Sequence, residues 1–217
     1  MNIADYIIAL PNLLGNAIEQ NQWIGYFAIL IAMFLENLIP PIPSEIIMPL
    51  GGFYVNQGQL HFLPVVIAGL VGTVLGAFPW YGIGRLVNEE RLEIWLVKYG
   101  RWLGISPKDL FKSRLWFGKH GNSLVFWGRL IPGIRTLISV PAGIELMPFL
   151  PFLLWTSLGS LIWIILLTTT GLILGESYNQ VSIFIDHYSS AVKLILLLIL
   201  TSIFIWIALR AWLKKSK

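Results

Sequence analysis

Two stretches of this chain are more apolar than a water-soluble fold of its size requires. Phe149–Leu174 and Leu194–Leu209 contain no charged residue, and each approaches or exceeds the roughly 20 residues that cross a bilayer. Only 12% of the 217 residues are charged, against about 25% in typical soluble domains. Because a backbone in lipid must satisfy its hydrogen bonds within helices, the sequence predicts an all-α integral membrane protein.

The basic residues are distributed unevenly along the chain. No lysine or arginine precedes Arg85, whereas the segment 85–119 is rich in both and a second basic group begins at Arg210. Under the positive-inside rule, this asymmetry places the central connector and the C-terminus in the cytoplasm and the N-terminus on the outer side of the cell membrane. The same rule accounts for the net charge of +4, so we expect no nucleic-acid partner.

The pattern of charge, proline and apolar residues divides a single membrane domain, 1–217, into five parts. We expect Leu63–Ile83 and Phe149–Gly175 to cross the bilayer. The parts are an interfacial N-terminal segment, 1–22, broken around Pro11 and Gly15; a first repeat, 23–84; an amphipathic cytoplasmic connector, 85–119; a second repeat, 120–175; and a final transmembrane helix, 191–213.

Each repeat contains a stretch in which prolines and glycines interrupt the apolar pattern, at about 36–58 and 122–143. Proline breaks helices, and broken backbone at membrane depth is tolerated where protein or water covers it. We therefore predict two re-entrant helical hairpins that open to opposite sides, which is the pattern of an inverted-repeat transporter. The residues expected to shape the hairpins are Pro40, Pro41, Pro43, Gly51, Gly52, Pro132, Gly133 and Gly143.

The same two stretches carry charges of opposite sign. Glu36 and Glu45 lie in the first, and Arg129 and Arg135 lie in the second. A charge at membrane depth costs about 2.5–3.5 kcal/mol on insertion scales, so it usually has a partner and often a function. The four side chains can meet only if the tips of the two hairpins meet.

Two interpretations of these charges remain open. The arginines either bind a phosphate through their planar, bidentate guanidinium groups or neutralise the glutamates across the repeat interface. The glutamates either carry a coupling proton, or another coupling cation, or are carboxylates satisfied by water beside a proline turn. The three histidines show no metal-ligand spacing, and no cofactor or metal is expected.

Three motifs resemble those of the DedA family of membrane proteins, which shares the VTT (SNARE-associated) domain. The resemblance covers roughly residues 20–180. The motifs are Glu36-Asn37-x-x-Pro40-Pro41-x-Pro43-Ser44-Glu45, Gly128-Arg129-x-x-Pro132-Gly133-x-Arg135 and Ala142-Gly143-x-x-x-Met147.

The resemblance implies lipid transport across the cytoplasmic membrane, with either undecaprenyl phosphate or a phospholipid such as phosphatidylethanolamine as substrate, and dependence on the proton motive force. It places the acidic pair of the family on Glu36 and Glu45, and its arginine pair on Arg129 and Arg135. Glutamate at position 45 departs from members that have aspartate there.

We therefore expect a transporter that moves a phosphate-bearing lipid between leaflets, and not an enzyme. A membrane-embedded lipid phosphatase is the first alternative, although no histidine lies within either charged motif and the chain has no cysteine nucleophile. A non-transporting scaffold is the second, although a scaffold does not need paired charges inside broken helices. The sequence is compatible with a homo-oligomer.

Overall fold

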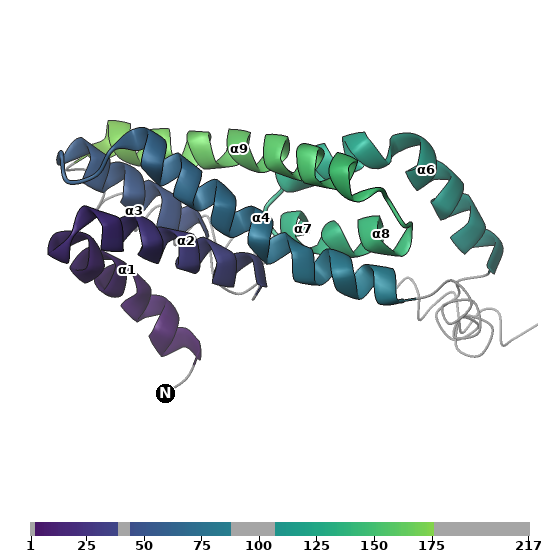
Figure 1. Ribbon diagram of the computed structural model, residues 1–217, viewed down its shortest axis with the longest axis horizontal. Helices are drawn as coiled ribbons and strands as arrows, with labels where there is room; N and C mark the ends of the chain where they lie inside the picture. Colours follow the sequence, from purple (N-terminus) through teal and green to yellow (C-terminus); the bar gives the residue numbers. More distant parts are fainter. Residues whose placement is uncertain (1–2, 39–43, 88–106, 176–217) are drawn as a thin grey trace, which may run out of the picture.

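The protein forms an elongated bundle of helices, seen in a computed structural model that describes residues 3–38, 44–87 and 107–175 (Figure 1). Within these ranges every regular element is a helix. The final helix expected over 191–213, much of the connector, and Pro40, Pro41 and Pro43 lie outside the described residues. The helices are α1 (Ile3–Gln20), α2 (Gln22–Leu38), α3 (Ser44–Asn56), α4 (Phe62–Leu86), α6 (Pro107–Arg129), α7 (Ile134–Leu137), α8 (Ser139–Ile144) and α9 (Phe149–Leu174).

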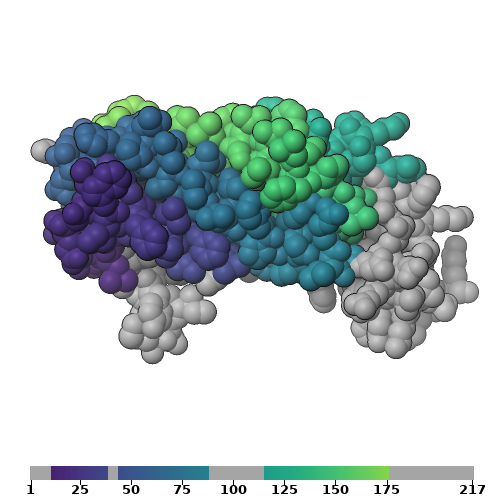
Figure 2. Space-filling model, viewed as in Figure 1, coloured from purple at the N-terminus to yellow at the C-terminus, as the bar shows by residue number. Residues whose placement is uncertain are grey.

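Two long helices, α4 and α9, run along the bundle and are long and apolar enough to cross a membrane. They confirm as helices the two spans expected at Leu63–Ile83 and Phe149–Gly175. In the view of Figure 2, the blue surface of α4 lies between α2, in purple, and α9, in green, and α4 contacts both of these helices.

Both long helices present apolar side chains outward at a spacing of four residues, which is one face of an α-helix. Soluble proteins rarely expose such continuous apolar stripes, so these faces have the character of a lipid-facing surface. The exposed positions are Leu63, Ile67, Val71 and Leu75 on α4, and Leu150, Leu154, Leu158, Ile162 and Leu166 on α9.

The short helices pack across the two halves of the chain. A Cβ atom at Gly52 of α3 would overlap the backbone of α9 at Thr168, and a Cβ at Gly143 of α8 would overlap the backbone of α4 at Tyr81. Helices that approach this closely need a residue without a side chain at the contact. Two of the expected hairpin-shaping glycines therefore lie where the short helices α3 and α8, called the short arms below, pack on a long helix. In each case the long helix belongs to the other half of the chain.

At each close contact the facing long helix also contributes a glycine. Gly171 of α9 lies against the Pro49 carbonyl of α3, and Gly84 of α4 lies against the Val140 carbonyl of α8. The two contacts thus use glycines on both partner helices and the same spacing, because in α3, α8, α9 and α4 alike the contacted carbonyl lies three residues before the glycine.

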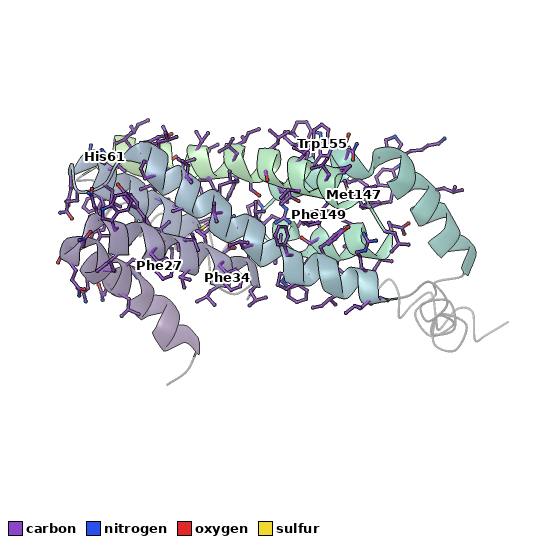
Figure 3. The ribbon with its side chains drawn as sticks, viewed as in Figure 1. Phe27, Phe34, His61, Met147, Phe149 and Trp155 are labelled. Atoms are coloured by element: carbon purple, nitrogen blue, oxygen red, sulfur yellow. The ribbon has the colours of Figure 1, made fainter. Side chains whose placement is uncertain are left out.

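The apolar interior is divided into two clusters. One includes Met33, Ile47 and Met48 and lies among α1–α4 and α9. The other is centred on Tyr81 and Phe152, whose rings stack 4.2 Å apart. Figure 3 labels His61 at the left end of the bundle, and Met147 and Phe149 to the right of its centre. Buried polar side chains occupy the region between the clusters.

Two predicted boundaries were wrong. Helix α1 is continuous through Pro11 and Gly15, because Leu14 and Ile18 are buried in the core and this packing offsets the hydrogen bond that proline removes. Helix α6 runs unbroken from Pro107 to Arg129. The expected division between connector and second repeat, at 119–120, therefore falls inside one helix, because charge density changes there but no proline interrupts the backbone.

Candidate functional site

Two helices end where the polar region begins. Helix α2 ends at Leu38, two residues after Glu36, and α6 ends at Arg129. After Arg129 the chain turns through Leu130–Gly133, where Pro132 cannot donate a hydrogen bond and Gly133 has φ of 79°, a backbone conformation that glycine adopts readily. Pro132 and Gly133 thus lie in the turn between the end of α6 and the start of α7.

Glu36 and Arg135 form an ion pair across the two charged stretches. An Nη2 hydrogen of Arg135 is donated to Oε1 of Glu36. Both side chains are buried, with Glu36 3% and Arg135 6% exposed. The two charged stretches, whose paired residues lie 99 positions apart in the sequence, therefore contact each other through this ion pair.

Arg129 is buried more completely than Arg135, at 1% exposed. Its Nη2 donates a hydrogen bond of 2.7 Å to Oγ of Ser139, the first residue of α8. Within the part of the chain that the structure describes, the Nε and Nη1 atoms of Arg129 and the Oε2 atom of Glu36 have no hydrogen-bond partner. A buried guanidinium with free donors can accept an anion at little further desolvation cost.

Glycine makes room for the arginine stem. A Cβ at Gly159 of α9 would lie 2.6 Å from the carbonyl oxygen of Phe126 and 2.8 Å from Cβ of Arg129. Helices α6 and α9 are therefore in backbone contact at the last turn of α6, which fixes the direction in which Arg129 leaves its helix.

Glu45 differs from Glu36. It is the second residue of α3 and is only half-buried. It makes no ion pair with the residues that the structure describes, although its charge lies close enough to act on Glu36. The structure therefore brings three of the four expected charged residues into the buried site and leaves Glu45 at its edge.

An asparagine beside Glu36 attaches α2 to α4. The Asn37 side chain donates to the Thr73 carbonyl at 2.5 Å, and Nε1 of Trp80 donates to the Asn37 carbonyl at 3.1 Å. Gly76 admits this contact, because a Cβ there would lie 2.8 Å from Cβ of Asn37. These bonds hold the C-terminal turn of α2, and with it Glu36, in place.

Three further hydroxyl groups are buried in the described part of the chain. The side-chain oxygens of Ser44, Thr73 and Thr156 have no partner among the described residues, so they remain able to bond a polar ligand. The described residues contain no group of three or more histidine, cysteine or acidic side chains placed to hold a metal ion.

Sequence reasoning identified the charges but missed two residues that position them. Asn37 lies inside the quoted acidic motif, and its buried amide next to Glu36 was the available signal. Ser139 was harder to find, because it lies ten residues after Arg129 in an apolar stretch and no local pattern links the two. Gly51, another of the residues expected to shape a hairpin, packs against two side chains. A Cβ built on Gly51 would lie 3.0 Å from Val65 and 3.4 Å from Ile29.

Broken helices, exposed apolar faces and a buried ionic centre together define a helical integral membrane protein with a polar site between its two apolar cores. The sequence matches the VTT domain over residues 22–172. The chain therefore belongs to the VTT-domain, or DedA, family of membrane proteins.

Several relatives carry names that describe an activity. An alkaline phosphatase-like protein of Lactococcus lactis subsp. cremoris is 43% identical over 177 residues, 81% of this chain and 82% of the relative. Undecaprenyl phosphate transporter A of Bacillus subtilis is 34% identical over 83% of this chain and 87% of its own. The protein of the same name in Staphylococcus aureus is 33% identical over 80% and 86%. No solved structure matches the chain significantly.

Proposed function

We propose that this protein moves a phosphate-bearing lipid, undecaprenyl phosphate or a phospholipid such as phosphatidylethanolamine, between the leaflets of the cytoplasmic membrane. The observation that carries the proposal is the buried charge cluster, in which Arg129 keeps two unpaired nitrogen atoms within the described residues while Arg135 pairs with Glu36. Guanidinium groups suit phosphate. Relatives named undecaprenyl phosphate transporter A support the same substrate class.

In this proposal α2–α3 and α6–α8 are re-entrant hairpins of an inverted repeat, with the N-terminus outside and the connector and C-terminus inside. The matching glycine contacts of α3 with α9 and of α8 with α4 support the repeat. The tips meet at the ionic centre, and the lipid tail remains in the bilayer beside the apolar faces of α4 and α9.

Coupling to the proton motive force is assigned to Glu36 and Glu45. Protonation of Glu36 would release Arg135, because a neutral carboxyl no longer forms an ion pair. The freed arginine would then complete the grip on the headgroup. Another coupling cation would act by the same competition for the carboxylate.

The test is leaflet-resolved transport by purified protein in liposomes, with a fluorescent polyprenyl phosphate, labelled phosphatidylethanolamine and the corresponding uncharged alcohol. We expect movement of a phosphate-bearing lipid, faster with an imposed proton gradient and absent for the alcohol. Glu36→Gln should abolish the response to the gradient. Equal movement of the alcohol would refute phosphate recognition.

A second candidate is a lipid phosphatase, favoured by the relatives named alkaline phosphatase-like. Release of inorganic phosphate from the same lipid, measured in the same vesicles, distinguishes it. Phosphate release that depends on Arg129 would replace the transport proposal by an enzymatic one.

A further inference from the structure

The two arginines of the site are held differently, and this suggests that they have different tasks. Arg135 is paired with Glu36, whereas within the described residues Arg129 donates one hydrogen bond, to the Ser139 hydroxyl, and forms no ion pair. A hydroxyl orients a guanidinium without neutralising it, because the hydroxyl oxygen carries no formal charge.

Ser139 itself is fully buried, at 0% exposed. The paired contacts of Gly52 and Gly143 align α3 with α8, and Met48 is then the counterpart of Ser139. Met48 is also 0% exposed and belongs to an apolar cluster. A polar side chain therefore stands at a core position that the other short arm fills with a large apolar one. Burying a hydroxyl is unfavourable unless it is hydrogen-bonded, and its bond here is to Arg129.

The arginine is thus fixed from two sides. Gly159 brings the backbone of α9 against its Cβ, and Ser139 holds one terminal nitrogen at the far end of the side chain. The Nε and Nη1 atoms have no partner within the described part of the chain. Fixing a long side chain in advance lowers the entropy that binding must offset.

We infer that Arg129 is the primary ligand of the lipid phosphate and that Ser139 is its positioning residue, while Arg135 joins only after it leaves Glu36. The inference rests on the proposed function, because it assumes that the site receives a phosphate monoester or diester carried by a lipid. It goes further by assigning different roles to the two arginines and a role to a serine outside both charged motifs.

The experiment measures the affinity of the full-length purified protein for farnesyl phosphate, a short lipid phosphate. Farnesol and inorganic phosphate are the competitors. Ser139→Ala should weaken binding about ten-fold, the usual effect of losing a hydrogen bond to a charged group. Ser139→Thr, which keeps the hydroxyl, should restore it. Thr168→Val is the matched control, because among the described residues the buried Thr168 hydroxyl bonds only the Ile164 carbonyl of its own helix.

A serine with a purely structural role could also weaken binding when it is replaced by alanine. Combining Ser139→Ala with each arginine variant separates the two roles. If Ser139 acts through Arg129, Ser139→Ala should weaken binding in the Arg135→Lys background and have no further effect in the Arg129→Lys background. An equal loss in both backgrounds, or no loss in the wild-type background, would overturn the positioning role even if wild-type protein binds farnesyl phosphate.

The competitors separate this failure from a failure of the proposed function. We expect neither farnesol nor inorganic phosphate to displace farnesyl phosphate at equal concentration. Displacement by farnesol, or no binding of farnesyl phosphate by wild-type protein, would refute phosphate-lipid recognition itself. Displacement by inorganic phosphate would assign the site to the free anion and overturn the lipid assignment.

Discussion

The two charged tips of this protein have similar scaffolds but different contents. In both, a helix ends within two residues of a charged side chain, the sequence continues Leu-Ile-Pro, and a short helix packs through glycine on a long helix of the other half. The first tip contributes Glu36 and the amide of Asn37, and the second contributes Arg129, Arg135 and the hydroxyl of Ser139. The close glycine contacts are thus shared, whereas the buried charge is acidic at the first tip and basic at the second.

This comparison separates what builds the site from what operates it. Equivalent glycines occur in both halves because the backbones of α3 and α9 approach each other as closely as those of α8 and α4. Charges are needed once each, because an ion pair has two different partners. Substitutions at shared positions should therefore have parallel effects, and substitutions at divergent positions should not.

The largest effect should come from the shared glycines. Gly52→Ala and Gly143→Ala would each place a Cβ onto a carbonyl oxygen of a facing helix, and overpacking against backbone should cost at least about 3 kcal/mol. Thermal unfolding of the purified variants in detergent would measure the loss. Gly82→Ala is the control, because nothing lies within 4 Å of a Cβ there. A stable Gly52→Ala beside an unstable Gly143→Ala would break the equivalence of the two contacts.

An effect of comparable size is expected at one of the two glutamates. Glu36→Gln leaves Arg135 buried without a counter-charge, which costs about 3–5 kcal/mol. Glu45→Gln should cost under about 1 kcal/mol, because Glu45 is half-buried and makes no ion pair with a described residue. Thermal stability of both variants tests this order. Stability should partly return when Glu36→Gln is combined with Arg135→Gln. If it does not, the broken Glu36–Arg135 ion pair is not the main cause of the destabilisation.

The arginines should differ in function more than in stability. Lysine keeps the charge but loses the planar fork, so Arg129→Lys should slow transport of a polyprenyl phosphate about ten-fold. Arg135→Lys should slow it less, since a lysine can still pair with Glu36. Transport rates in liposomes containing equal amounts of each protein measure the difference. A greater loss in Arg135→Lys would reverse the assigned order of the two arginines.

The smallest perturbation is a labelling test that leaves function intact. The chain has no cysteine, so single cysteines at the exposed Gln57 and Lys119 can be labelled without background. If the two halves open to opposite sides, an impermeant thiol reagent outside intact cells should modify Gln57→Cys and spare Lys119→Cys. The opposite pattern would place the first short arm on the cytoplasmic side.

The sequence predicted the elements whose cause is local. Long apolar runs identified α4 and α9, and Pro132 and Gly133 beside Arg129 identified the break after α6. It also indicated Arg129 and Arg135 as the nearest plausible counter-charges of Glu36 and Glu45, because no basic residue lies near the two glutamates in their own half. Helix α1 could not be predicted as continuous, since the packing of Leu14 and Ile18 that offsets Pro11 is tertiary.

Within the site, the sequence could indicate that acidic and basic side chains pair, but not which individual residues form each contact. Which arginine meets Glu36 depends on the turn at Gly133, and the half-buried position of Glu45 depends on how α3 leans on α9. The Arg129–Ser139 bond joins the end of one helix to the start of another. Such a contact is fixed only when both helices are in place, and no spacing rule in the sequence describes it.

The crossed packing of the short arms makes the two halves mutually dependent for folding. Each long helix packs against the short helix of the other half. A half-chain made alone would therefore leave the glycine contact surface of its own long helix uncovered. Two fragments separated between α4 and α6 should each be unstable and should become stable only as a complex, as the subunits of an obligate dimer do. Covalent continuity then acts as a high effective concentration, so that one polypeptide folds in the way that two interlocked subunits assemble.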